Sequence, residues 1–186
     1  AILFSIVDET KQEKILKNVL ENDEIPAITT PYFNFFELDV LCRMGKLTEV
    51  LDKIRSYWGG MLDLGAVTFW EEYDPSVPKE EQYDMYGDHF GKSLCHAWAA
   101  SPIYFLAKYF AGLDLVNKDG VTYILKPQMQ YFTELDCTLP VGSNGDVRLV
   151  WDGEILEITP NADGGILELG EQKLSLVRGE TRRVKI

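Results

Sequence analysis

Histidine and cysteine are both scarce in this sequence, which limits the chemistry open to it. Only two histidines occur, His89 and His96, and no HExxH pattern is present, so we expect no zinc site. The cysteines are Cys42, Cys95 and Cys137, which are odd in number and include no CxxC pair. They are predicted to be small buried hydrophobic residues, neither a disulfide framework nor metal ligands. We therefore expect no metal and no other cofactor.

Basic residues are also few, since 18 Lys and Arg stand against 30 Asp and Glu, giving a net charge of −12. Nucleic acids and anionic membrane surfaces both bind clustered basic residues, so neither is an expected partner. No apolar run approaches the ~20 residues that span a bilayer. A hydrophobic content of 46% nevertheless indicates a folded chain. This composition is compatible with a neutral substrate such as a sugar.

The N-terminus has neither an initiator Met nor the basic stretch that begins a signal peptide. Residues 1–7 are almost wholly apolar, as expected at the end of a buried helix or strand. We therefore expect this chain to be a fragment of a larger protein.

The first part of the sequence has helical patterning. Thr30-Pro31 opens an apolar stretch that Gly45 closes, and Thr48 begins a second amphipathic stretch, which predicts two helices joined by a short turn. Further on, the pattern predicts a long helix over residues 93–110, with Pro102 kinking or dividing it. A set of helix pairs such as these suits the last part of a barrel built from helical hairpins.

From about Leu113 the period changes to short apolar runs. Val147, Leu149 and Trp151 alternate with polar residues, as in a half-buried strand. Turn sequences separate the runs at residues 117–120, 142–145, 152–153, 163–165 and 178–179. Closely spaced strands of this kind predict an antiparallel β-sandwich or jelly roll. The sequence thus predicts an α+β chain with a helical part, 1–112, and a β part, 113–186.

The stretch Trp58–Asp74 (WGGMLDLGAVTFWEEYD) combines aromatic rings, glycines and carboxylates. An aromatic ring offers an apolar platform for a sugar face, and a carboxylate supplies hydrogen bonds or proton transfer. The stretch therefore suits a sugar site. The alternative, from composition alone, is an ordinary loop closed by a Trp side chain.

Several motifs in residues 30–104 resemble the C-terminal catalytic region of the α-L-rhamnosidases, a family of inverting glycoside hydrolases with an (α/α)6 barrel. The Thr30-Pro31 opening, with the helix end at residues 41–45, is one of them. Residues 65–71 (GAVTFWE) look like that family's G-A-T-T-x-W-E segment, and residues 91–97 (GKSLCHA) look like its S-x-N-H segment. The resemblance implies a partial (α/α)6 barrel followed by the family's C-terminal sandwich.

The resemblance also implies a mechanism with two separated carboxyls. Glu71, which follows the motif Trp, corresponds to the general base, and the general acid belongs to an upstream part of the barrel that this chain does not contain. The substrate implied is a terminal α-L-rhamnose on a plant-derived glycoside or polysaccharide. The chain departs from the family at Cys95, where Asn is usual, and at Glu72, where a basic residue is common. The second departure leaves open which Glu faces the site.

Other residues are candidates for binding the substrate. Trp70 is predicted to form a platform under the sugar, and His96 to bind a hydroxyl or orient Glu71; the alternative for His96 is a core residue bonded to a carbonyl. Asp63 is a weaker candidate for binding hydroxyls, and Trp58 is either a site residue or core. Further candidates for the rim are Tyr83, Tyr86 and His89. Trp98, within the predicted helix, is expected to pack in the core.

Other functions remain open beside the rhamnosidase. One is a different (α/α) barrel hydrolase that acts on another terminal sugar. Another is a noncatalytic sugar-binding module, in which Glu71 would lie outside any cleft.

Overall fold

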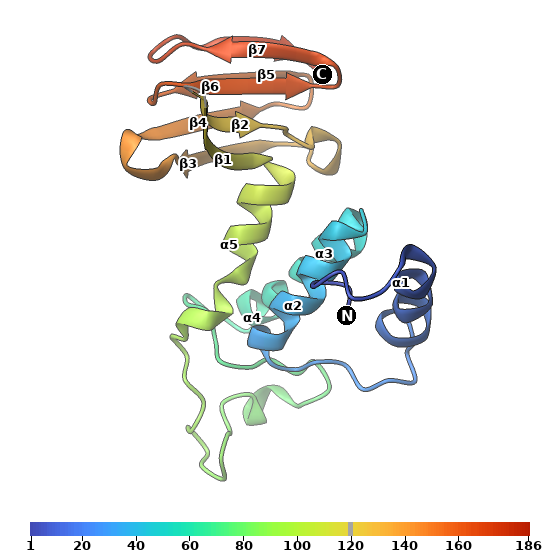
Figure 1. Ribbon diagram of the computed structural model, residues 1–186. Coiled ribbons are helices and arrows are strands. Elements are labelled where there is room, and N and C mark those ends of the chain that lie inside the picture. Colours follow the sequence, from blue (N-terminus) through green and yellow to red (C-terminus); the bar gives the residue numbers. More distant parts are fainter. Residues whose placement is uncertain (119–120) are drawn as a thin grey trace. The chain divides into compact units, whose positions relative to one another are not determined.

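The computed structural model describes residues 1–118 and 121–186. The chain is α+β, with helices first and strands from Leu113 onward, as the sequence predicted. It divides into two compact units, residues 1–102 and 103–186 (Figure 1). No helix among the described residues is long and apolar enough to cross a membrane.

The predicted pair of helices is confirmed as α2, Pro31–Arg43, and α3, Leu47–Lys53. Pro31 stands in the first turn of α2, where its missing N–H is not needed, and Gly45 takes the left-handed φ of 73° that a short turn requires. Leu38 and Val50 are fully buried. The α2–α3 hairpin therefore contributes buried apolar side chains to the core of the first unit.

Shorter helices complete the first unit. Helix α1, Glu9–Ile15, continues as a π-helical turn over Leu16–Leu20, and α3 continues likewise over Ile54–Trp58 before α4, Gly59–Asp63. Short 3-10 turns occupy Lys79–Glu81 and Ala97–Ala99.

The long helix predicted over residues 93–110 is wrong in its first half. Helix α5 covers Ser101–Phe105 and continues as a π-helical turn over Leu106–Phe110, whereas residues 91–96 are not helical. His96 is instead extended, and its backbone N–H donates to the carbonyl of Phe69 at 2.8 Å. Pro102 falls in the first turn of α5, where proline is tolerated, so it neither kinks nor divides the helix.

The second unit holds two four-stranded sheets, consistent with the predicted sandwich. One sheet has the order β1-β2-β6-β7, and the other has the order β3-β4-β5-β8. The strands are β1 Leu113–Lys118, β2 Val121–Leu125, β3 Leu135–Pro140, β4 Asp146–Trp151, β5 Ile155–Pro160, β6 Gly165–Leu169, β7 Gln172–Leu176 and β8 Arg182–Lys185. Every pair is antiparallel except β2 with β6, which is parallel. Of the turn predicted at 117–120, residues 119 and 120 lie outside the described residues.

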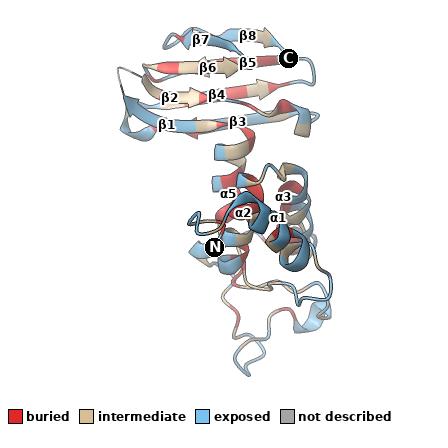
Figure 2. Cartoon of the chain, turned by 45° about the vertical axis from the view of Figure 1, so that its right-hand side comes forward, coloured by how far each residue is buried: buried red, intermediate tan, exposed pale blue. Residues whose placement is uncertain are grey.

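One core joins the two sheets. The alternation predicted for β4 is confirmed, because Val147 and Leu149 are 0% exposed and Trp151 is 7% exposed. Tyr123 and Leu167, from the other sheet, belong to the same buried cluster. Figure 2 shows buried stretches in strands of both sheets. Burial of alternate residues from both sheets is the source of this unit's stability.

Candidate functional site

The two sequence motifs lie side by side in the first unit. The backbone N–H of Glu71 donates to the carbonyl of Ser93 at 2.9 Å, and that of His96 donates to the carbonyl of Phe69 at 2.8 Å. These bonds join the segment around Trp70 to the non-helical segment that precedes Ala97. The structure thereby brings together Glu71 and His96, which are 25 residues apart in the sequence.

Glu71 is held on both carboxylate oxygens. Oε2 accepts the backbone N–H of Ser93 at 3.0 Å, and Oε1 accepts the hydroxyl of Tyr86 at 2.8 Å. His96 Nδ1 lies 3.8 Å from Oε2. Glu71 as a whole is only 8% exposed. The two hydrogen bonds thus fix the side chain in one orientation.

The hydrogen bonds to Glu71 favour its charged form. The Ser93 N–H is the largest influence and lowers the pKa of Glu71; burial opposes it, and the Tyr86 hydroxyl then assists it. The carboxylate is therefore ionised at neutral pH. Nearby, burial lowers the pKa of Lys92, although surrounding carboxylates oppose that change.

Tyr86, which sequence reasoning placed only at the rim, is a direct partner of Glu71. It is 81% exposed and has a φ of 56°, in the left-handed region that few residues other than glycine adopt. Its pKa is raised, chiefly by its hydrogen bond to Glu71. The neighbouring Gly87 was a signal of an unusual turn here, but it did not show which way the Tyr86 ring points.

The Glu72 side chain has a different hydrogen-bond partner from those of the Glu71 side chain. Its Oε1 accepts the hydroxyl of Thr29 at 2.8 Å, whereas Glu71 bonds to Ser93 and Tyr86. The two adjacent side chains thus reach different segments of the chain. Of the two glutamates, Glu71 is therefore the one beside His96.

The two tryptophans that sequence reasoning placed near the sugar are both buried. Trp58 is 5% exposed, and its Nε1 donates to the carbonyl of Ala99 at 2.8 Å. Trp70 is 4% exposed and packs edge-on against the Tyr83 ring, with 5.6 Å between centroids. Both rings thus pack within the unit and leave almost none of their surface exposed. Asp63 is exposed at the end of α4.

Trp98 differs most from its prediction. It was expected to lie on a helix and to pack in the core, yet it is 51% exposed, because the chain does not become α-helical until Ser101. Its ring lies 4.0 Å from the His96 ring and 5.6 Å from the Tyr32 ring, between centroids. An exposed aromatic surface therefore begins directly beside His96.

The cysteines also differ in part from their prediction. Cys42 is buried as predicted and Cys137 is intermediate, but Cys95 is exposed because its segment is a loop and not a helix. Cys95 and Cys137 are free thiols. Within residues 1–118 and 121–186, no group of three or more His, Cys, Asp or Glu side chains is arranged to hold a metal ion.

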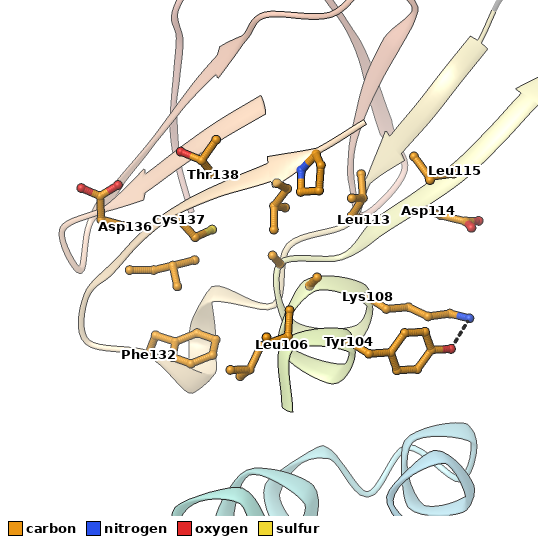
Figure 3. A pocket seen from close by; sticks show the side chains of 16 residues that line it. Tyr104, Leu106, Lys108, Leu113, Asp114, Leu115, Phe132, Asp136, Cys137 and Thr138 are labelled. Atoms are coloured by element: carbon orange, nitrogen blue, oxygen red, sulfur yellow. Dashed lines mark hydrogen bonds between the residues drawn. The ribbon is translucent and has the colours of Figure 1, made fainter. Parts of the chain in front are cut away.

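The second unit has a separate apolar groove of about 760 Å³ (Figure 3). Leu106, Leu113, Phe132 and Cys137 line it, coming from the end of the α5 helix and from β1, β3 and the segment before β3. At its rim, Lys108 Nζ donates to the hydroxyl of Tyr104 at 2.9 Å. None of the residues predicted for a sugar site lines this groove.

The site around Glu71 combines an ionised carboxylate with a neighbouring histidine. An ionised, oriented carboxylate with a histidine beside it can accept a proton from water. The Glu71 side chain retains about a tenth of its accessible surface. No model of a known protein family matches this sequence, and no curated protein is significantly similar to it.

Proposed function

We propose that this chain supplies the general base of an inverting glycoside hydrolase that releases terminal α-L-rhamnose. Glu71 takes a proton from a water molecule, whose oxygen then attacks the anomeric carbon from the face opposite the leaving group. A second carboxyl protonates the leaving oxygen. Inversion needs the two carboxyls ~6.5–9.5 Å apart, so that the water fits between them.

The hydrogen bonds around Glu71 support this proposal most strongly. A general base must be ionised and must be oriented before the water arrives. The Ser93 N–H and the Tyr86 hydroxyl do both, because each stabilises the charge and each fixes one oxygen. In this proposal His96, whose Nδ1 lies 3.8 Å from Glu71 Oε2, binds the same water or a sugar hydroxyl.

The general acid belongs, in this proposal, to a segment outside this chain, and the helices of residues 1–102 form part of an (α/α)6 barrel with it. The α2–α3 hairpin is the kind of unit from which such barrels are built. By itself, this chain is then expected to bind a rhamnoside without hydrolysing it.

The experiment is an assay of aryl α-L-rhamnoside hydrolysis by a protein that contains the complete barrel. Glu71→Gln removes the base while keeping the size of the side chain, so turnover should fall by about 10²–10⁴-fold. Glu72→Gln is the matched control and should retain most activity. Near-normal turnover by Glu71→Gln would overturn the proposal. A panel of other aryl glycosides would detect a hydrolase for a different sugar.

A further inference from the structure

An exposed aromatic patch lies next to the candidate site. We define it by Tyr32, Phe33 and Phe36 of α2, together with Trp98. Their exposed fractions are 45%, 57%, 39% and 51%. The Tyr32 ring is at its centre, 5.2 Å from Phe33, 5.6 Å from Phe36 and 5.6 Å from Trp98, between centroids.

The patch is continuous with the polar groups of the site. Trp98 lies against the His96 ring, and His96 Nδ1 lies 3.8 Å from the Glu71 carboxylate. The apolar surface of the Trp98 ring is therefore followed by the His96 ring and then by the ionised Glu71 carboxylate. A ligand that covers Trp98 has its edge within reach of His96 and Glu71.

Trp98 is held in place before any ligand arrives. The next residue, Ala99, is fully buried, and its carbonyl accepts the Trp58 Nε1–H at 2.8 Å. The N–H of Ala99 donates in turn to the carbonyl of His96 at 3.1 Å. Because the backbone on this side of Trp98 is anchored, little conformational entropy is lost when a ligand packs on the indole ring.

We infer that Trp98 and Tyr32, and not the buried Trp70, form the platform on which a sugar ring of the substrate stacks. This inference rests on the proposed function and names the surface that holds the substrate. Both side chains combine an apolar face with a polar tip, the Trp98 Nε1–H and the Tyr32 hydroxyl, so they match a sugar's apolar face and hydroxyl edge.

A sugar suits this surface better than an apolar partner segment does. An apolar segment packed on Trp98 would remove water from Glu71 and His96 without replacing its hydrogen bonds, and burying a charge in this way is costly. Sugar hydroxyls replace those bonds, because each both donates and accepts. The ligand class is therefore a neutral pyranoside, such as an α-L-rhamnoside.

The fluorescence of Trp98 can itself report whether a ligand covers the patch. Of the four tryptophans, Trp58, Trp70 and Trp151 are 4–7% exposed, so iodide in solution quenches the fluorescence of Trp98 selectively. The full chain is titrated with methyl α-L-rhamnoside, with methyl β-D-glucoside in parallel. We expect the rhamnoside to protect Trp98 from iodide and to shift the emission to shorter wavelength.

Variants separate the platform from the rest of the surface. Tyr32→Ala keeps the reporter and should weaken binding by roughly two- to tenfold, the value of one aromatic contact. Trp98→Ala should weaken binding similarly when it is followed by ligand-observed NMR. Phe4→Ala is the control, since Phe4 is exposed but outside the patch, and its affinity should be unchanged. Circular dichroism checks that each variant is folded.

The outcomes distinguish this inference from the proposed function. Rhamnoside binding that neither protects Trp98 nor responds to Tyr32→Ala overturns the platform and leaves the rhamnosidase proposal standing. Protection of Trp98 by the glucoside alone supports the platform but contradicts the rhamnoside assignment. Binding of neither sugar overturns the platform outright.

Discussion

Replacing Trp58 with Phe should destabilise the first unit. Trp58 is 5% exposed, and its Nε1 makes a buried hydrogen bond of 2.8 Å to the Ala99 carbonyl. Phe keeps an aromatic ring but cannot donate, so the carbonyl is left buried without this partner, at a cost of about 1–3 kcal/mol. The smaller ring leaves a void that adds about 1 kcal/mol. We expect the free energy of unfolding to fall by about 2–4 kcal/mol.

The measurement is urea unfolding of the full chain, followed by far-ultraviolet circular dichroism. With a slope of about 2 kcal/mol per molar urea, the midpoint for the first unit should fall by roughly 1–2 M. The matched control is Trp98→Phe, because Trp98 is half-exposed and this substitution should change stability by no more than about 0.5 kcal/mol. A loss for Trp98→Phe as large as that for Trp58→Phe would show that the buried hydrogen bond of Trp58 contributes no special stability.

Other substitutions test separate parts of the structure. Tyr86→Phe removes a hydrogen bond that lowers the pKa of Glu71, so the pKa of Glu71 should rise. As the solution is acidified, Glu71 should then lose its charge, and the stability that this charge contributes, at a higher pH than in the unmodified protein. NMR titration of the Glu71 carboxyl carbon measures the pKa, and an unchanged or lower value would contradict this prediction. Tyr123→Phe should raise the free energy of unfolding of the second unit by about 1–3 kcal/mol, because the Tyr123 hydroxyl is buried with no hydrogen-bond partner among the described residues; a loss of stability in urea unfolding would refute this. Gly165→Ala should cost about 1–3 kcal/mol, since its Cβ would lie 2.4 Å from the Tyr123 ring, and unchanged thermal unfolding would show that the ring yields freely.

Local signals in the sequence predicted the elements that depend on local interactions. Pro31 and Gly45 marked the beginning of α2 and the turn before α3, because each residue has a backbone preference that suits its position. The alternation of Val147, Leu149 and Trp151 predicted β4 for the same kind of reason. In each case one short stretch of chain contained the whole signal.

The non-helical conformation of residues 93–96 could not be predicted in this way. Their pattern suits a helix, but the backbone bonds between Ser93 and Glu71, and between His96 and Phe69, hold them in a non-helical conformation. Bonds between distant segments are invisible to a local pattern. The exposure of Trp98 was missed for this reason, although Glu71 and His96 were both identified from the motifs.

The Glu71→Ala variant would show whether the Glu71 carboxylate activates water on one face of the sugar. In a protein with the complete barrel, this variant removes the base and opens room for a small anion. We predict that it loses rhamnoside hydrolysis and that added azide restores turnover. The azide nitrogen would bond to the anomeric carbon as the leaving group departs with a proton from the acid, giving a rhamnosyl azide of inverted configuration. Near-normal hydrolysis by Glu71→Ala without azide, or an azide product of retained configuration, would contradict the account.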